Sequence, residues 1–303
     1  MSGFNQQFIY SVIIIALGYL FKRFNLLKEK DGEGLSRIVF NLTLPALIVV
    51  TFNDIHLEFS LMLLIVCAIV YGGLIAVVGL FIYRKEANKV KGTLMMLVPG
   101  FNIGLFAYPL VEGIWGQKGV QYFGMFDVGN AFIVYGLIYI MGSFYSSEDV
   151  NLSATFIAKK MLKSVPFITY IIVCLLNILN LHLPAPVIHV SKLISVANMP
   201  MSLLLLGLYL NFTFDKSYNK LILKLLSVRY LIGLAVGILL FFLLPLGEMF
   251  KYTLLLGFIL PTSVSSLAYA VEFGYDERFV GTVSNITVLI SFFLLWGIGN
   301  FIL

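Results

Sequence analysis

Residues 97–109 read LVPGFNIGLFAYP, and residues 260–270 read LPTSVSSLAYA. Each stretch places prolines, glycines or clustered hydroxyls in the middle of a segment that is otherwise apolar enough to cross a membrane. Such a break persists only inside protein or beside a water-filled cavity, because unpaired backbone groups in hydrocarbon cost several kcal/mol each. The two breaks, at Pro99, Gly100 and Pro261, occupy corresponding places in the two halves of the chain. Paired breaks of this kind are typical of the midplane substrate site of a secondary transporter built from inverted repeats.

The composition indicates a polytopic protein of the cell membrane. The chain has 303 residues, of which 60% are hydrophobic and 12% are charged, whereas soluble domains have about 25% charged residues. Lys22 and Arg23 follow the first apolar segment, while a secretory signal peptide carries its basic residues in front, so we predict a retained span. The net charge of +5 does not indicate nucleic-acid binding, because the basic residues fall in short loops between spans, as membrane topology requires.

We predict an all-α membrane protein with ten spans, each long enough to cross about 30 Å of hydrocarbon. The apolar segments lie near residues 6–22, 35–52, 60–83, 92–112, 119–145, 164–181, 187–210, 222–246, 252–273 and 279–302. All but three of the 20 Lys and Arg residues fall in or beside the odd-numbered loops, the exceptions being Lys118, Lys192 and Lys251. Because loops rich in Lys and Arg stay in the cytoplasm, we expect both termini to be extracytoplasmic.

The two halves carry a weak internal repeat. Ser36 is followed by Pro45 nine residues later, and Ser191 is followed by Pro200 at the same spacing. The Ala-Tyr pairs that end at Tyr108 and Tyr269 show a similar offset. We therefore predict two five-helix repeats, residues 1–146 and 164–303, joined by a cytoplasmic linker, residues 147–163. Five spans per repeat is an odd number, so the second copy would insert upside down, with broken helices four and nine crossing each other.

Five stretches carry a resemblance to a known family. They are GYLFKRF (18–24), LSRIVFNLTLPA (35–46), NIGLFAYPL (102–110), residues 127–130, and the segment from Leu260 to Asp276 that ends in FGYD. Together they cover the chain in order, and the chain resembles the auxin efflux carrier family, which includes the plant PIN-FORMED proteins and many prokaryotic permeases. This resemblance implies a scaffold domain of spans one, two, six and seven, a transport domain of spans three to five and eight to ten, and an organic-anion substrate such as a carboxylate. The family often has proline at both crossing points, whereas here Pro109 stands at one and Ser266 at the other.

The candidate substrate site combines amides, hydroxyls and broken backbone. The Asn102 side chain offers two donors and an acceptor, which suits a carboxylate or an unwound backbone. The hydroxyls that follow Pro261 favour an anion, because they lie beside the expected N-terminus of a half-helix. The alternative roles are helix–helix packing for the amide and bonds to helix carbonyls for the hydroxyls. The predicted substrate-binding residues are Asn102, Gly104, Pro109, Ser263, Ser265, Ser266 and Asn41.

Asp127 is the deepest acidic residue, in the predicted fifth span. A charge at that depth is costly and by default functional. It would either carry a coupling proton, bind a cation such as sodium, or orient Asn130 and Asn102. The alternative is a solvated position near the outer interface. Another pattern, GLAVG (233–237), indicates close packing of helices.

These patterns predict a secondary transporter that moves a small organic anion by alternating access across the lipid bilayer. The three histidines lack a metal-ligand pattern, so we expect no metal site and no cofactor. One alternative is a sodium-coupled symporter of the bile-acid type. A membrane-embedded enzyme and a passive channel are further alternatives, although no catalytic motif is present. Substrate identity, transport direction, coupling ion, and the choice between monomer and homodimer stay open.

Overall fold

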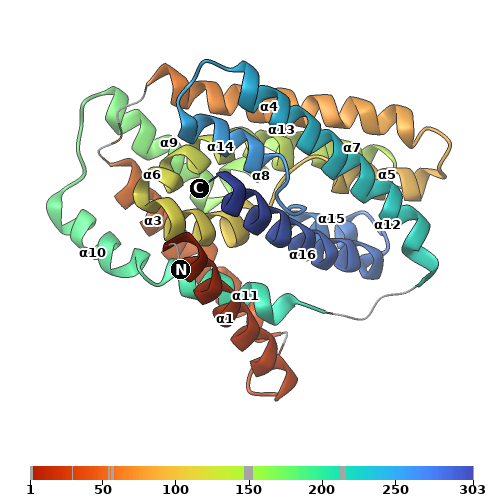
Figure 1. Cartoon of the computed structure of the whole chain (residues 1–303), viewed down its shortest axis with the longest axis horizontal. Coiled ribbons are helices and arrows are strands. Elements are labelled where there is room, and N and C mark those ends of the chain that lie inside the picture. The colour runs from red at the N-terminus through yellow and green to blue at the C-terminus, as the bar shows by residue number, and fades with distance from the viewer. Residues whose placement is uncertain are drawn as a thin grey trace.

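The computed structural model describes residues 3–28, 30–53, 55, 58–146, 153–211 and 216–302. Within these residues every regular element is a helix, which confirms the predicted all-α class. Figure 1 shows the helices packed side by side, with the C-terminal helix α16 passing close to the N-terminal helix α1. Residues 147–152 of the predicted linker lie outside the described residues.

The helices follow one another without strands between them in the described chain. The first half contains α1 (Gly3–Arg23), α2 (Asp31–Ile38), η1 (Val39–Thr43), α3 (Leu44–Phe52), α4 (Phe59–Ile82), α5 (Asn88–Leu97), η2 (Ile103–Ala107), α6 (Tyr108–Ala131), η3 (Phe132–Leu137) and α7 (Ile138–Phe144). The second half contains α8 (Ala154–Leu162), α9 (Val165–Ile178), α10 (Ala185–Ser195), α11 (Asn198–Tyr209), η4 (Lys216–Tyr218), α12 (Asn219–Leu226), η5 (Ser227–Leu231), α13 (Ile232–Leu243), α14 (Glu248–Gly257), α15 (Ser265–Glu272) and α16 (Glu277–Ile302).

Seven helices of the described chain are long and apolar enough to cross a membrane, and α8 with α9 forms an eighth candidate that bends by 84°. One of the seven, residues 103–144, changes direction at Gly116, whose φ is 59°. Two further apolar segments are interrupted, between α5 and η2 and between α14 and α15. This arrangement is compatible with the ten predicted spans, and the inverted repeat stays a prediction.

One contact falls at the spacing of the predicted repeat. The Thr43 hydroxyl and the Asn198 side-chain oxygen lie 3.1 Å apart and are separated by 155 residues, which is the spacing between Ser36 and Ser191. This contact is compatible with a two-fold axis between the repeats, and the repeat stays a prediction.

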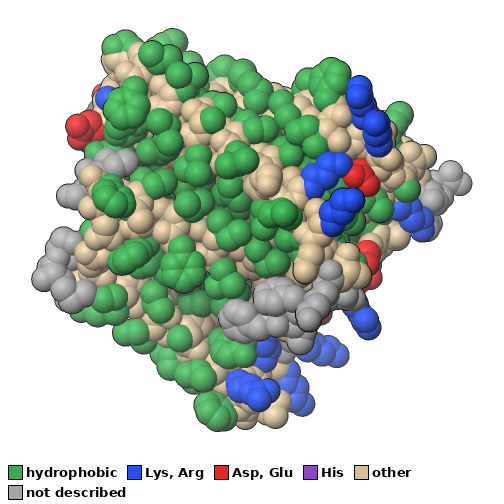
Figure 2. All heavy atoms as spheres, turned by 45° about the vertical axis from the view of Figure 1, so that its right-hand side comes forward, with side chains coloured by type: hydrophobic (Ala, Val, Ile, Leu, Met, Phe, Trp, Pro, Cys, Tyr) green, Lys and Arg blue, Asp and Glu red, His purple; other side chains and the backbone are tan. Residues whose placement is uncertain are grey.

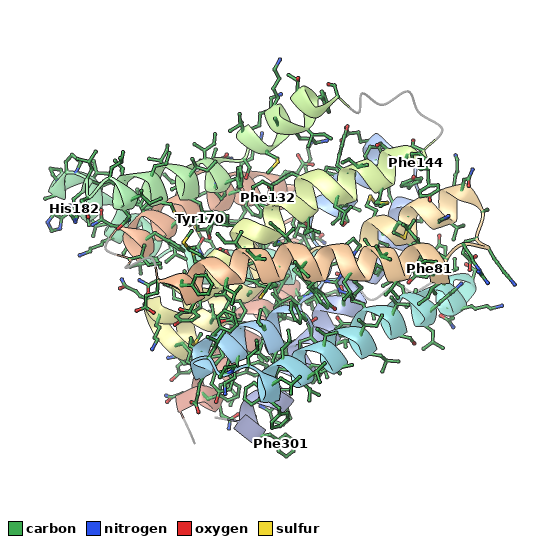
Figure 3. The ribbon with its side chains drawn as sticks, turned by 90° about the horizontal axis from the view of Figure 1, so that it is seen from above. Phe81, Phe132, Phe144, Tyr170, His182 and Phe301 are labelled. Carbon is green, nitrogen blue, oxygen red and sulfur yellow. The ribbon has the colours of Figure 1, made fainter. Side chains whose placement is uncertain are left out.

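The surface matches a protein surrounded by lipid. Figure 2 shows hydrophobic side chains over the middle of one face, with most Lys and Arg side chains at its right-hand and lower edges. Large apolar side chains such as Leu193 and Phe242 are about 80% exposed. Figure 3 places Phe81 and Phe144 at one end of the bundle and His182 at the other, as the predicted loops require.

Close packing of α13 brings η5 against the second helix break. A Cβ atom on Gly233 would lie only 2.5 Å from the Phe258 carbonyl oxygen, and one on Gly237 would lie 3.1 Å from the Leu255 Cα atom. Only glycine fits the first position without a shift of backbone. The predicted packing role of GLAVG is therefore confirmed.

Candidate functional site

The two helix breaks cross and are joined by a backbone hydrogen bond. Residues 98–102 separate α5 from η2, and residues 258–264 separate α14 from α15. The Asn102 N–H donates to the Pro261 carbonyl over 2.9 Å. Gly100 adopts a φ of +84°, where a Cβ atom would also lie 2.4 Å from Ile138. Pro99, Gly100 and Pro261 thus all lie within the two non-helical segments.

The position of the crossing differs from the one that the resemblance implied. The segments meet at Asn102 and Pro261, whereas Pro109 lies in α6 and Ser266 lies in α15. Pro109 lies inside the helical run that begins at Ile103, so its ring removes one intrahelical hydrogen bond, and the helix nevertheless continues. The wider turns of the preceding π-helix η2 lead directly into that position.

A pocket opens beside the crossing and contains about 580 Å³ of empty space, part of it open to solvent. Its walls come from both breaks and from η1, α6, η3 and α9. The lining residues are Phe40, Leu44, Phe101, Asn102, Ile103, Gly104, Asp127, Asn130, Ala131, Val134, Tyr135, Ser164, Pro166, Phe167, Tyr170, Ser263, Val264 and Ser265. The structure therefore brings together six of the predicted site residues, namely Asn102, Gly104, Ser263, Ser265, Asp127 and Asn130.

The other predicted substrate-binding residues do not line this pocket. Asn41 is exposed, and its amide donates to the Arg37 carbonyl over 2.8 Å. Pro109 is buried in the first turn of α6. Ser266 is 1% exposed, and its hydroxyl has no hydrogen-bond partner among the described residues.

Asn102 both caps a helix and presents a donor to the pocket. Its side-chain oxygen accepts a hydrogen bond from the Leu105 N–H over 3.2 Å, which makes Asn102 the N-cap of η2. Its amide nitrogen makes no hydrogen bond with the described residues. The residue is 6% exposed and lines the pocket, so its amide nitrogen is a largely buried hydrogen-bond donor that a ligand in the pocket could reach.

A chain of polar side chains supports the first break from behind. Asn130 accepts from the Phe101 N–H over 2.9 Å and donates to the Phe101 carbonyl over 3.1 Å. The same amide donates to Asp127 over 3.2 Å, and the Tyr108 hydroxyl donates to the other carboxylate oxygen over 2.9 Å. The Tyr108 hydroxyl also meets that of Tyr170, which Figure 3 labels on α9. Both oxygens of Asp127 are therefore engaged in holding the site.

The second break contributes hydroxyls at the start of α15. The Ser263 hydroxyl accepts from the Ser265 N–H over 3.3 Å, and both residues line the pocket. Thr262 instead faces α16, where its hydroxyl lies 3.2 Å from that of Thr287. The N-termini of η2–α6 and of α15 thus both begin at the pocket wall. Helix N-termini carry a partial positive charge and free N–H groups, which favour an anion.

Sequence reasoning missed the buried cation of the site. The charge pattern groups Arg229 with the basic residues beside a loop, whereas the side chain is 0% exposed in η5. Its guanidinium carbon lies 4.7 Å from the centre of the Phe101 ring, which lines the pocket. The available signal was its place inside a largely apolar run, LKLLSVRYLIGL (223–234), seven residues after the start of the predicted eighth span.

Comparison with known proteins agrees with this architecture. A family described as membrane transport protein matches residues 7–298. The chain is 24% identical to an uncharacterized transporter of Methanocaldococcus jannaschii, over 94% of this chain and 95% of the relative. It is also 24% identical to an uncharacterized transporter of Methanothermobacter thermautotrophicus, over 70% of each protein. The chain therefore belongs to the membrane transport protein family, in which its motifs had placed it through their resemblance to the auxin efflux carriers.

Proposed function

We propose that this membrane transport protein is a secondary transporter that moves a small organic anion, such as a carboxylate, by alternating access. The observation that carries the proposal is the pocket at the crossing, where two helix N-termini and free polar donors meet. Both N-termini would stabilise a carboxylate through their N–H groups and partial charge. The Asn102 amide nitrogen and the Ser265 hydroxyl would add directional hydrogen bonds.

The remaining walls favour an anion with a compact apolar part. Phe40, Phe101 and Phe167 line the pocket and offer ring surfaces for that part. Among the lining residues of the described chain, Asp127 is the one charged side chain, and its oxygens are bonded to Tyr108 and Asn130. The positive field would come from the helix N-termini, and from Arg229 behind the Phe101 ring.

Alternating access requires contacts between the two predicted domains to break and reform. Two hydroxyl pairs join α9 of the predicted scaffold to the predicted transport domain: Tyr170 with Tyr108, and Ser164 with Tyr135. A salt bridge of 2.6 Å between Lys160 and Glu272 joins α8, in the predicted linker, to α15 of the predicted transport domain. The partly exposed Lys160–Glu272 pair would separate at modest cost, because such ion pairs contribute little stability. Further bonds between the predicted domains join Gln121 to the Thr51 carbonyl, and Asn5 to Asn300 and Trp296.

A thermal-stability screen of the purified protein tests the proposal. We expect at least one carboxylate from a panel of mono- and dicarboxylates, amino acids and indole acids to stabilise the fold. A ligand at 100 times its Kd adds about 2.7 kcal/mol. The matching uncharged amides are the control, and they should have little effect. Stabilisation by amines or neutral amides in place of acids would contradict an anion site.

Two additions separate the alternatives. The screen is repeated with potassium in place of sodium in the buffer. A sodium-coupled symporter would be stabilised by its substrate in the sodium buffer and not in the potassium buffer. Recovering the ligand chemically unchanged after incubation argues against an enzyme.

We further propose that both termini lie outside the cytoplasm. In a background with Cys67 and Cys174 replaced by alanine, we introduce single cysteines at the exposed residues Lys85 and His182. In intact cells, an impermeant maleimide should label His182→Cys and leave Lys85→Cys unmodified, because the basic loop would be cytoplasmic. Permeabilised cells provide the control, in which both label. The reverse pattern in intact cells would overturn the orientation.

A further inference from the structure

One buried guanidinium bonds to both crossing segments. From the first segment, Arg229 Nη1 donates to the carbonyls of Leu97 over 3.2 Å and Val98 over 2.5 Å, and Nη2 donates to that of Gly100 over 2.9 Å. From the second, Nη2 donates to the carbonyls of Leu260 over 2.7 Å and Pro261 over 2.9 Å, with Nε also 3.3 Å from that of Leu260. The side chain thus engages five carbonyls across the crossing.

This use of arginine follows from its chemistry. The carbonyls at and beyond the C-terminal end of a helix lack helical partners, and the helix dipole makes that end negative. A planar guanidinium offers five N–H donors in a fixed fork, whereas a lysine ammonium offers three from a single point. An Arg buried without partners would be very costly, so its placement here indicates that the carbonyls and the Phe101 ring supply the compensation.

No carboxylate within the described chain forms a salt bridge with Arg229. The side chain is therefore committed to the backbone of the two segments and is not left free for a ligand. It lies behind the Phe101 ring rather than on the pocket wall. Its role is consequently to position the backbone of the two crossing segments.

We propose that Arg229 is a positioning residue that ties the two crossing segments into one unit, so that both halves of the pocket move together. The claim that both halves of the pocket move together rests on the proposed transport function. The claim that Arg229 ties the two segments to each other does not depend on that function. The second direct link, from the Asn102 N–H to the Pro261 carbonyl, is a single backbone bond. Without the guanidinium, that bond would be the remaining direct hydrogen bond between the two segments among the described residues, beside the packing of Tyr71 against Phe101 and Phe258.

Hydrogen exchange of backbone amides, measured on the full chain in detergent, tests the proposal without a substrate. In Arg229→Met, peptides that cover residues 98–102 and 258–264 should exchange at least about tenfold faster, because lost hydrogen bonds raise the population of locally open states. Arg229→Lys keeps the buried charge with fewer donors, so both peptides should show a smaller increase. If the methionine variant does not fold, the lysine variant carries the test.

Tyr230→Phe is the matched control. Tyr230 is the next residue, is 6% exposed, and its hydroxyl bonds to the Thr287 carbonyl over 2.9 Å and to Ser291, whose own hydroxyl donates to the Ile259 carbonyl of the second break. This variant should therefore accelerate exchange at the second break at most, and leave exchange at residues 98–102 unchanged. The proposal is overturned if only one break loosens in the Arg229 variants, if neither does, or if Tyr230→Phe gives the same pattern. If no carboxylate stabilises the protein, the proposed substrate is wrong, but the hydrogen-exchange result still tests the role of Arg229 because it needs no substrate.

Discussion

Replacing Asn102 by alanine should abolish uptake of the carboxylate while leaving the protein folded. The substitution removes the amide nitrogen that lines the pocket and the oxygen that caps η2 over 3.2 Å. A buried donor or acceptor left without its partner costs about 1–3 kcal/mol, which raises Kd by roughly 5- to 150-fold. Binding is measured by calorimetry on the purified protein, and transport is measured in proteoliposomes.

Asn102→Asp separates the two roles of this side chain. An aspartate keeps an oxygen for the Leu105 N–H and is itself a good N-cap, so the fold should stay as stable as that of the native protein. It also replaces a donor to the ligand with a negative charge, so the carboxylate should no longer bind. Normal affinity in Asn102→Asp would show that the alanine variant fails through loss of the cap. Normal uptake in both variants would remove Asn102 from the site.

The elements that could be predicted are those with a local chemical signal. Pro99, Gly100 and Pro261 interrupt apolar runs, and each lies within a break of the structure. Proline lacks an N–H and glycine permits positive φ, so both act through their own backbone and need no distant neighbour. The crossing point that the resemblance put at Pro109 lies elsewhere, because Pro109 belongs to the helix that begins at Ile103 and the segments meet at Asn102 and Pro261.

The supporting contacts could not be predicted in this way. Arg229 resembles any basic residue near the end of a span, and its partners are 129 to 132 residues before it or 31 to 32 residues after it. Likewise, Tyr108 and Tyr170 meet through hydroxyls that lie 62 residues apart in the chain. Such pairs depend on which helix faces of different spans come together, and residue spacing in one sequence does not contain that information.

Asp127 decides between two mechanisms, and Asp127→Asn should lower exchange and uphill accumulation together. Both of its oxygens accept hydrogen bonds, from Tyr108 over 2.9 Å and from Asn130 over 3.2 Å. Asn130 in turn holds the backbone of Phe101 at the first break. An amide in place of the carboxylate offers one acceptor where two are used, so we expect the orientation of Asn130 to be lost. A loss of about 1.4 kcal/mol corresponds to a tenfold decrease in both activities.

The two activities are compared in proteoliposomes loaded with unlabelled carboxylate, with and without a proton gradient. Exchange needs only alternating access, whereas accumulation also needs the coupling ion. Asn130→Ala is the matched variant, because it removes the link between Asp127 and Phe101 and leaves the carboxylate in place. If Asp127 orients the site, both variants should lose exchange and accumulation to a similar extent. If Asp127→Asn exchanges normally and cannot concentrate substrate, while Asn130→Ala loses both activities, then Asp127 carries the driving proton and the orienting role is wrong.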